Sequence, residues 1–454
     1  MQVDKSKIII PESSSIRETM MRLDAMPLGI IVLVNESREL KGIVTDGDIR
    51  RALASGTSID SPVSTIMNRN PVSTQKGDSN HRILRLFNEK IRQIPVTDGN
   101  GRVVDVLLYN DYLAKAQDLR RHVVVRCKAP LRISFAGGGT DIDSYIKAKS
   151  GAVLSTTINK FCRGTLIKRD DEKIVIHSSD YEVKLEISSI SAIQYNGELD
   201  LIKAVIKLMR PDFGMDLHLE SDVLPRTGLG GSSSAAVVTA GLLNYFREEK
   251  LDDYQLAEIA FQAERVELGI SGGWQDQYAS VFGGFNFMEF RDNDVFIHPL
   301  RLKQELLNEL ETSLVLCFMG QSRSSAAPAA PQASDSNAAY AALDMTRDLT
   351  LEMRNFLLKG ELSRFGESLH TAWEGKKKFT GGITNPKVEH LYQLARENGA
   401  LGGKVLGAAG GAYILFFCPP LAKHKMIRAL RAASAETFDF SFDSQGLQTW
   451  TAKA

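Results

Sequence analysis

The sequence PRTGLGGSSSAAVVTAGLLN, from Pro225 to Asn244, joins a glycine–serine loop to a run of small and apolar helix formers. Three glycines within four residues (Gly228, Gly230 and Gly231) let the backbone turn its N–H groups inward, and a helix start adds partial positive charge. Both features suit phosphate. The stretch has neither the lysine of a Walker A motif nor the glycine spacing of a dinucleotide-binding fold. It indicates a phosphate-binding loop of another kind; a plain turn before an ordinary helix is the alternative.

Two further stretches combine a strand-like run with a glycine-rich turn. They are KAPLRISFAGGGTD (Lys128–Asp141) upstream and GGKVLGAAGGAYILFF (Gly402–Phe417) downstream. In this order and at these distances, the three stretches resemble the three motifs of the GHMP small-molecule kinases, over roughly residues 123–450. The AGGGTD form of the first motif is similar to the branch that contains heptose 7-phosphate kinases and fucokinase-like enzymes.

A diverged duplication precedes this region. LKGIVTDGDIRRAL (Leu40–Leu53) aligns without a gap on RVVDVLLYNDYLAK (Arg102–Lys115), and an apolar strand and a turn precede each copy. The repeat resembles a tandem pair of CBS domains, whose clefts often hold adenine nucleotides. In the first copy, Thr45 and Asp48 stand where that family contacts phosphate and ribose, and a hydroxyl and a carboxylate suit these contacts.

The second copy departs from the CBS pattern. Leu108 replaces the threonine and Asp105 replaces the glycine, so Asp111 is left alone. A regulatory nucleotide site in the first copy is therefore one interpretation. A purely structural module, or one that forms a homodimer, is the other.

Together, the two resemblances predict an α+β chain, with a two-lobed GHMP kinase fold preceded by an α/β CBS module. A chain of 454 residues is too long for one ordinary core. We expect the CBS pair over residues 1–117, a linker over 118–122 and the kinase domain over 123–454. Within the kinase domain, the N-terminal lobe is expected at about 123–315 and the C-terminal lobe at about 316–454.

The composition is that of a soluble globular protein, with 43% hydrophobic and 24% charged residues. Lys+Arg and Asp+Glu both total 55, so the net charge is zero and neither nucleic acid nor an anionic membrane is an expected partner. The four cysteines form no C-x-x-C pair, which argues against a zinc site or a disulfide framework. The start of the chain has no signal-peptide core and no apolar run is long enough to span a bilayer, so we expect a cytoplasmic protein.

The first kinase motif implies contacts to the acceptor sugar. By resemblance, its AGGGTD turn lies beside the sugar, so the expected substrate contacts are Gly138, Gly139, Thr140 and Asp141. Arg132 stands where related kinases often place a lysine near the catalytic base. A fixed cation there would favour an ionised carboxylate and stabilise developing negative charge. A surface ion pair at a strand end is the alternative for Arg132.

The glycine–serine loop supplies the expected contacts to ATP, which are Pro225, Gly228, Leu229, Gly230, Gly231, Ser232, Ser233 and Ser234. Downstream, DDYQLAEIAFQAERVELG is expected to form one helix, with an apolar face made by Leu256, Ile259, Ala263 and Val266. Glu264 lies at the margin of that face. In the family, a glutamate here binds Mg²⁺ together with a serine hydroxyl, and oxygen ligands suit that ion. Ungapped alignment points to Ser232 and Glu264; Ser233, Ser234 and Glu267 are alternatives.

GISGGWQDQYASVFGG (Gly269–Gly284) completes the expected site. Asp276 matches the family's catalytic aspartate, which would accept the proton of the substrate hydroxyl or orient that hydroxyl. The segment is one residue longer than in mevalonate-type kinases, which leaves the register of Glu264 open. The alternative role of Asp276 is that of a turn residue in a polar loop.

Two stretches offer cations for a second phosphate. MGQSRSSAAPAAPQASDSNAAYAAL (Met319–Leu343) is rich in Ala, Ser and Pro, as is typical of a mobile loop or lid, and it contains Arg323. The other is the run Lys376–Lys378, with Lys377 as the expected contact; an ordinary solvated face is the alternative. The third motif reads GAAGGA, with Ala409 and Ala412 in glycine positions, a departure that would tighten the turn.

The expected reaction transfers the γ-phosphoryl group of ATP, with Mg²⁺, to a sugar or sugar phosphate. The resemblance favours the anomeric hydroxyl of D-glycero-D-manno-heptose 7-phosphate, on the way to nucleotide-activated heptose. A fucokinase-like sugar 1-kinase is the nearest rival. A non-catalytic nucleotide or sugar sensor is a rival of another class, and the retention of Asp276, Glu264 and the serines argues against it.

Overall fold

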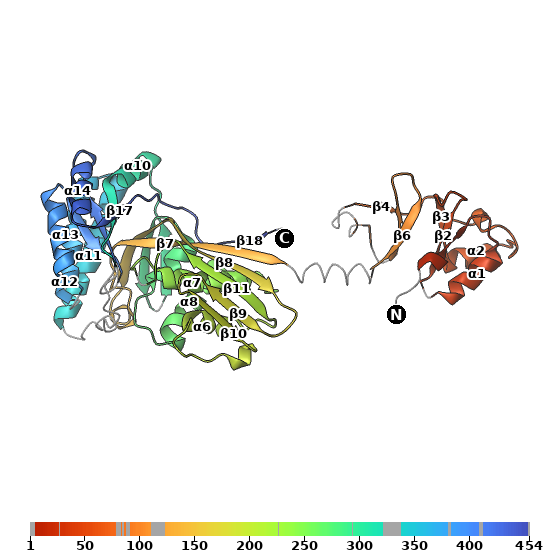
Figure 1. Ribbon diagram of the computed structural model, residues 1–454, viewed down its shortest axis with the longest axis horizontal. Helices are drawn as coiled ribbons and strands as arrows, with labels where there is room; N and C mark the ends of the chain where they lie inside the picture. The colour runs from red at the N-terminus through yellow and green to blue at the C-terminus, as the bar shows by residue number, and fades with distance from the viewer. Residues whose placement is uncertain are drawn as a thin grey trace. The chain divides into compact units, whose positions relative to one another are not determined.

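The computed structural model describes residues 5–26, 28–78, 83, 86–87, 91–109, 123–225, 227–292, 294–320, 337–379, 383–407 and 412–452. The chain divides into two compact units, Met1–Arg120 and Arg121–Ala454 (Figure 1). Each unit buries a hydrophobic core of its own.

The first unit contains two small sheets of the same topology. One has the order β1-β2-β3 and the other the order β4-β5-β6. In each sheet the first pair of strands is parallel and the second pair is antiparallel, so the duplication seen in the sequence is present in the backbone. The elements are β1 (Ile9–Pro11), α1 (Ile16–Ala25), β2 (Ile30–Val34), β3 (Leu40–Thr45), α2 (Asp46–Ala54), β4 (Thr74–Gln75), β5 (Gln93–Thr97) and β6 (Val103–Leu108).

The second unit is built on an eight-stranded sheet around one long strand, β8 (Gly151–Lys168). β8 pairs with β7 along one edge, and with β12 and then β11 along the other. The other strands of this sheet are β7 (Val124–Ala136), β9 (Ile174–Ser178), β10 (Val183–Ile187), β11 (Met215–Ser221), β12 (Asn286–Arg291), β13 (Asp294–Pro299) and β18 (Gln448–Ala452). Because β18 pairs with β7, the chain's last strand belongs to this sheet. The expected C-terminal lobe is therefore not a continuous stretch from 316 to 454.

Helices α6 (Asp200–Met209), α7 (Gly231–Asn244), α8 (Asp253–Phe261) and α9 (Gln275–Phe282) cover one face of the sheet (Figure 1). α7 is the most deeply buried of them, and its side chains from Ala236 to Leu243 are inaccessible or nearly so. A Cβ atom on Gly164 of β8 would lie 2.6 Å from Cγ1 of Val238, so the close approach of helix and strand requires glycine there. The phosphate-loop candidate at the start of α7 is thus held on the rigid centre of the unit.

A second sheet, of order β15-β16-β14-β17, lies beside a group of helices (Figure 1). These elements are α10 (Gln304–Ser313), β14 (Leu314–Phe318), α11 (Asn337–Lys359), α12 (Leu362–Phe379), α13 (Pro386–Glu397), β15 (Gly402–Val405), β16 (Tyr413–Phe417), α14 (Pro420–Ala432) and β17 (Glu436–Phe438). β7 links the two parts, because Val125 packs in the core under α7 while Ile133 and Phe135 pack with α12 and the second sheet. The strand that leads into the first glycine motif therefore belongs to both cores.

The expected single helix around Glu264 is wrong in one respect. α8 ends at Phe261 and continues as a π-helix over Gln262–Glu267. The wider π turn shifts the phase of the side chains. Val266, expected on the apolar face, is 71% exposed, whereas Glu264 is only 6% exposed.

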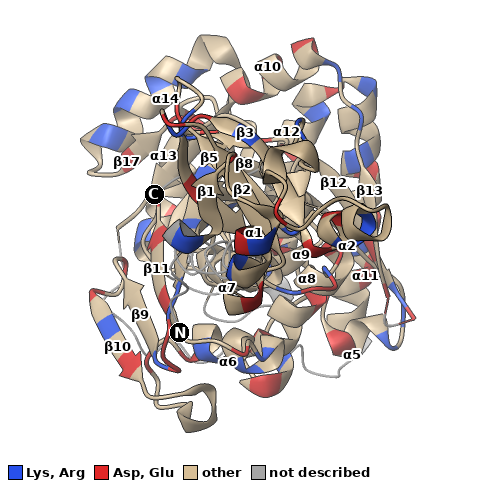
Figure 2. Ribbon diagram, turned by 90° about the vertical axis from the view of Figure 1, so that its right-hand side faces the viewer, with Lys and Arg blue, Asp and Glu red and all other residues tan. Residues whose placement is uncertain are grey.

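The expected loop over Met319–Leu343 is also shorter than predicted, because α11 begins at Asn337. Residues 321–336, which include Arg323, lie outside the described residues. The four cysteines are buried and unpaired, as expected. In the ranges that the structure describes, no helix is both long and apolar enough to cross a membrane. Charge lies in small patches, with acidic residues on α10 and basic residues on α14 (Figure 2).

Phe365 offers a test of the core shared by β7 and the second sheet. Its ring is fully buried, and its centroid lies 5.2 Å from that of Phe135 in an edge-on arrangement. Phe365→Ala leaves a cavity and is expected to lower the free energy of unfolding by about 3–5 kcal/mol in urea titrations. Leu358→Ala, at a position 50% exposed on the neighbouring helix α11, should change it by less than about 0.5 kcal/mol. Equal effects of the two variants would contradict the proposed packing.

Candidate active site

The phosphate-loop candidate has the backbone that its glycines predict. Gly228 has φ +91° and Gly230 has φ +79°, both in the left-handed region that favours glycine. α7 starts at Gly231, and no side chain caps this end of the helix. The first N–H groups of α7 therefore keep their capacity to bind an anion, as expected for a loop that leads into a helix N-terminus.

The third glycine motif packs directly against this loop. A Cβ atom on Gly407 would lie 2.4 Å from Cα of Gly228, and one on Gly228 would lie 2.3 Å from the carbonyl oxygen of Leu406. Ala412 N–H also donates to the carbonyl of Thr227, at 3.2 Å. Only glycine fits on both sides of such a contact. Residues 408–411, and with them Ala409, lie outside the described ranges.

Arg132 joins this loop to the expected catalytic aspartate. Its Nε donates to Oδ1 of Asp276 at 2.7 Å, and its Nη1 donates to the carbonyl of Gly228 at 2.6 Å. Its backbone N–H donates to the carbonyl of Leu229, at 3.1 Å. Arg132 is 4% exposed, so the ion pair is shielded from water and is not the surface pair considered as its alternative. The Asp276 side chain, by contrast, retains 20% exposure at the start of α9.

Two residues of the AGGGTD turn, Thr140 and Asp141, make contacts other than those expected. Asp141 is 1% exposed, and its carboxylate accepts hydrogen bonds from Gly139 N, Gln275 N and Gln275 Nε2 at 2.9, 3.1 and 3.0 Å. Burial raises the pKa of Asp141. The Thr140 hydroxyl is inaccessible and donates to the carbonyls of Gly137 and Ala152. These contacts correct the expectation that Thr140 and Asp141 face the sugar: both are turned inward, where they hold the turn against β8 and α9.

Gly138 and Gly139 remain at the partly exposed surface of that turn. A Cβ atom on Gly138 would lie 3.4 Å from Nε2 of Gln275. The exposed side of the turn at Gly138 therefore lies close to Gln275, the residue that precedes Asp276.

Glu264 and Ser233 bring a carboxylate and a hydroxyl together, the two oxygen groups expected to bind magnesium, and they are called the oxygen pair below. Ser233 Oγ donates to Oε2 of Glu264 at 2.8 Å, and Gln277 Nε2 donates to the same oxygen at 2.5 Å. Burial raises the pKa of Glu264, although Arg265 lies 3.5 Å away. Glu264 lies in the π-helix over Gln262–Glu267.

The alternatives for the oxygen pair separate clearly. Ser232, the first choice from ungapped alignment, has no hydrogen bond to Glu264, whereas Ser233 has one. Ser234 shares a hydrogen bond of 2.7 Å with Ser280. Glu267 accepts from Tyr195 and Lys207 at the surface. Among the described residues, no three His, Cys, Asp or Glu side chains gather into a metal-binding group. A carboxylate with one hydroxyl fits Mg²⁺ that takes its other ligands from nucleotide phosphates and water.

In the lysine run Lys376–Lys378, Lys376 rather than the expected Lys377 lies beside the candidate site. Lys377 pairs with Glu374 at 2.8 Å and lines a separate surface pocket with His370 and Tyr392, so its place does not support the expected phosphate contact. Its neighbour Lys376 points the other way, because successive residues on a helix lie about 100° apart. Nζ of Lys376 donates to the carbonyl of Gly407 at 2.5 Å.

Lys404 was missed by sequence reasoning. It is 5% exposed on β15, and its Nζ donates to the carbonyl of Phe135 at 3.2 Å. The available signal was a charged residue inside the apolar run GGKVL, immediately before the third glycine motif.

In the first unit, Thr45 and Asp48 are already engaged with each other. They form a capping box at the start of α2, in which Thr45 N donates to Oδ2 of Asp48 at 2.9 Å and Asp48 N donates to Thr45 Oγ1 at 3.4 Å. Asp48 also pairs with Arg51 at 2.6 Å. A structural role thus accounts for both residues without a ligand.

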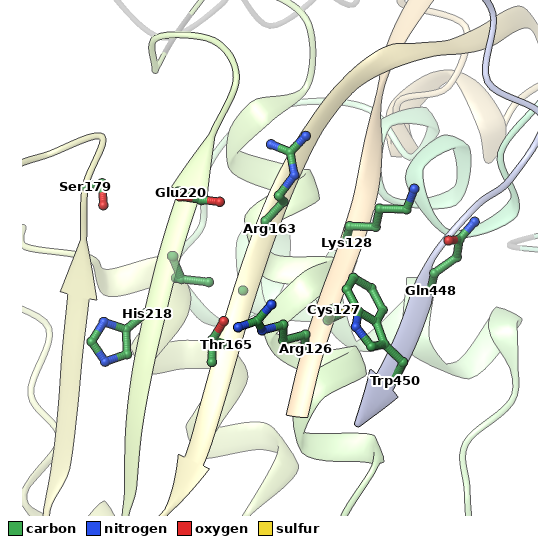
Figure 3. Close-up of a pocket in the computed structure, with 12 residues that line it drawn as sticks. Arg126, Cys127, Lys128, Arg163, Thr165, Ser179, His218, Glu220, Gln448 and Trp450 are labelled. Carbon is green, nitrogen blue, oxygen red and sulfur yellow. The ribbon is translucent and has the colours of Figure 1, made fainter. Parts of the chain in front are cut away.

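A broad hollow of about 760 Å³ lies on the open face of the main sheet, away from these groups. Arg126, Lys128 and Arg163 project into it beside Trp450 and His218 (Figure 3). They come from β7, β8, β11 and β18, and none of the expected site residues lines it. The hollow is therefore distinct from the candidate active site.

Comparisons with known proteins identify the same parts of the chain. The family described as GHMP kinases N terminal domain matches residues 200–284, and the GHMP kinases C terminal family matches 353–436. The CBS domain family matches residues 3–55 and 63–118. The chain is 37% identical to the D-glycero-alpha-D-manno-heptose 7-phosphate kinase of Campylobacter jejuni over 345 residues, which cover 72% of this chain and 98% of that protein.

A solved structure and a more distant relative extend these matches. The crystal structure of a D-glycero-D-manno-heptose 1-phosphate kinase from Bacteroides thetaiotaomicron superposes with a TM-score of 0.61 at 32% identity, over 73% of this chain and all of that one. A bifunctional fucokinase/GDP-fucose pyrophosphorylase of Arabidopsis thaliana is 24% identical over 333 residues, which cover 68% of this chain and 31% of that protein.

The buried carboxylate of Glu264 yields a prediction about stability. Because burial raises its pKa above the ordinary value of 4.5, the folded state disfavours the charged form, and this penalty grows as pH rises from the ordinary pKa to the raised one and is constant above it. Glu264→Gln removes the charge, and the unpartnered Oε1 of Gln277 can accept from the new amide. We expect a gain of about 1 kcal/mol in unfolding free energy at pH 7 and a flatter pH profile above the ordinary pKa of 4.5, measured by urea denaturation.

Glu267→Gln is the matched control. The pKa of Glu267 is lowered by its hydrogen bonds with Tyr195 and Lys207, so loss of its charge should not stabilise the fold. If Glu264→Gln were less stable than the parent at every pH, the desolvation argument would be wrong.

Proposed function

The chain belongs to the GHMP kinase family and is an ATP-dependent sugar kinase with a CBS domain pair, and on that premise we propose that it phosphorylates the anomeric hydroxyl of D-glycero-D-manno-heptose 7-phosphate. The product would serve the synthesis of nucleotide-activated heptose. The choice of acceptor is supported by the heptose 7-phosphate kinase of Campylobacter jejuni, to which the chain is 37% identical over nearly the whole of that protein.

The observation that carries the proposal is the double contact of Arg132. One guanidinium bonds both the Asp276 carboxylate and the backbone of the phosphate loop, so a proton acceptor and a phosphate site lie on either side of one fixed cation. Phosphoryl transfer depends mainly on positioning and on charge stabilisation, which this arrangement supplies.

In the proposed reaction, the anomeric oxygen bonds to the γ-phosphorus while the bond from that phosphorus to the leaving oxygen of ADP breaks. The hydroxyl proton passes to Asp276, whose carboxylate is held in place by the 2.7 Å contact with Arg132. Charge that develops on the transferring group faces Arg132 and the uncapped start of α7. Gly138 and Gly139 leave space for the sugar above the turn that Asp141 holds in place.

Ser233 and Glu264 are the residues that would hold Mg²⁺ with the nucleotide. When bound, the ion offsets negative charge on the phosphates. Gln277 fixes the Glu264 carboxylate through its 2.5 Å hydrogen bond, and the π-helix presents that carboxylate to α7.

Asp276→Asn tests both the reaction and the role of its carboxylate. The amide keeps the shape but cannot accept the proton, so kcat with heptose 7-phosphate should fall by about 10²- to 10⁴-fold, with little change in KM for ATP. Asp294→Asn, an exposed aspartate on β13, is the control and should retain full activity. ADP release should be followed with heptose 7-phosphate, mannose, fucose and galactose.

Turnover of heptose 7-phosphate alone supports the proposed acceptor. Turnover of fucose instead would favour a fucokinase-like enzyme. ATP binding without turnover of any sugar would favour a sensor.

For the CBS pair, we propose that the first copy binds an adenine nucleotide through Thr45 and Asp48 and alters kinase activity. Both residues face one another at the start of α2, where backbone N–H groups and two oxygen-bearing side chains come together. A ligand there would have to compete with the capping box, so the expected affinity is modest.

The variant Thr45→Ala/Asp48→Ala should abolish both nucleotide binding and the change in activity. Because it also removes a helix cap, Ser15→Ala/Glu18→Ala is the matched control: it deletes the capping box of α1 in the same unit and should lose similar stability while keeping the response. Binding should be measured by calorimetry on the full chain. If the first variant kept an unchanged response, the CBS pair would be a structural or a dimerising module instead. Size-exclusion chromatography would then tell a monomer from a dimer.

A further inference from the structure

Two lysines of the second unit lie beside the proposed reaction centre without an assigned role. Lys376 is partly buried on α12, and Lys404 is 5% exposed on β15. Each has one hydrogen bond to a backbone carbonyl, from Lys376 to Gly407 at 2.5 Å and from Lys404 to Phe135 at 3.2 Å. An ammonium group has three donors, so neither lysine is fully satisfied by these contacts.

Neither lysine has a counter-ion among the residues that the structure describes. No carboxylate there forms an ion pair with Lys376 or Lys404. Lys203 shows how this fold satisfies a buried lysine: it is 3% exposed, but Asp200 lies 3.0 Å away and Gln194 and Asn196 also accept from it. A buried ammonium without such partners costs several kcal/mol.

The carboxylates that act electrostatically on these lysines, Asp141 and Asp276, already have other hydrogen-bond partners. Asp276 is paired with Arg132, and Asp141 accepts three N–H groups. Burial lowers the pKa of Lys376 to about 8, and Arg132 adds to this effect while Asp141 and Asp276 oppose it. Burial also lowers the pKa of Lys404 well below its ordinary value, with repulsion from Lys376 and Arg132. Among the described residues, no free carboxylate is therefore left to pair with either lysine.

The hydrogen bonds of the two lysines place their ammonium groups near the AGGGTD turn and near the phosphate loop. Phe135, which binds Lys404, directly precedes the AGGGTD turn expected beside the acceptor. Gly407, which binds Lys376, lies against Gly228 of the phosphate loop. An anion in contact with both ammonium groups would thus lie where nucleotide and acceptor meet.

We propose that Lys376 and Lys404 together form a binding site for a phosphate group carried by one of the two reactants. The statement that this phosphate belongs to a reactant rests on the proposed kinase function. The phosphate is either the one that the acceptor already carries or one that arrives with ATP, and both share the chemistry of a compact anion with several acceptor oxygens.

The test uses Lys376→Met, Lys404→Met and the double variant in the full chain. Methionine keeps the length of the side chain and removes the charge. Lys203→Met, which deletes a buried lysine that has its own counter-ion, is the matched control. Three quantities are measured for each protein: the melting temperature, the apparent Kd for inorganic phosphate from the rise in that temperature, and KM for heptose 7-phosphate and ATP.

We expect the double variant to weaken phosphate binding at least about tenfold, because charge-assisted hydrogen bonds to an anion are lost. A rise in KM for heptose 7-phosphate alone assigns the site to the acceptor, and a rise for ATP alone assigns it to the nucleotide. The melting temperature of the free variant should stay the same or rise, since an uncompensated charge has been removed. Lys203→Met should lose stability and keep all three binding constants.

Calorimetry gives a second readout that needs no turnover. Because burial lowers the pKa of Lys376 to about 8 in the free protein, a bound phosphate beside it should raise that pKa and cause proton uptake near pH 8, and the double variant should lack this uptake. The proposal is overturned if phosphate Kd and both KM values stay within twofold of the parent. It is also overturned if the variants simply lose stability as Lys203→Met does. Inorganic phosphate reports on the site even if no sugar is phosphorylated, so failure of the kinase assignment would be seen separately.

Discussion

The site depends on the buried ion pair between Arg132 and Asp276. Arg132 sits on β7, which packs in both cores of the second unit, and it reaches the start of α9 and the phosphate loop together. A planar guanidinium with several donors in fixed directions can make these contacts at once, which a lysine cannot. The cost of burying the pair is offset by the hydrogen bonds to Gly228 and Asp276. Distant parts of the chain are thereby held in one geometry.

Close backbone packing provides the second constraint. The contact between Gly228 and Gly407 leaves no room for a Cβ on either side, and Gly164 lets α7 lie directly on β8. As a result, the phosphate loop is clamped between the main sheet and the third motif. The AGGGTD turn is also stabilised by hydrogen bonds, because Asp141 accepts from the backbone N–H of Gly139 and Thr140 donates to the carbonyl of Gly137. These hydrogen bonds support the AGGGTD turn from within.

Charge is distributed unevenly over this framework. The carboxylates of Asp141 and Glu264 are buried, and burial raises the pKa of each. Arg132, Lys376 and Lys404 are the basic residues near one another in this region, and only Arg132 has a carboxylate partner within the described part of the chain. Such an imbalance is costly in a folded protein and is typical of a site that receives a charged reactant.

Several features could be read from residues alone because they follow from local chemistry. Gly228, Gly230 and Gly231 predicted a turning backbone, and the first two have positive φ while Gly231 begins α7. The order of the three glycine motifs predicted the kinase fold. The internal repeat predicted two similar sheets, which the first unit contains. Arg132 and Asp276 were expected to lie together, and they do.

Other features depended on the phase of helices and on where strands cross, which no local pattern reports. In the π-helix Glu264 is buried and Val266 is exposed. On α7 it is Ser233, and not Ser232, that donates to the Glu264 carboxylate. One step along α12 separates Lys376, beside the site, from Lys377, which pairs with a surface glutamate. Lys404 became visible only when β15 was placed against β7. The residue types and their spacing thus defined the chemistry available, and the three-dimensional packing selected which neighbouring residue performs it, because a shift of one residue turns a side chain to another face.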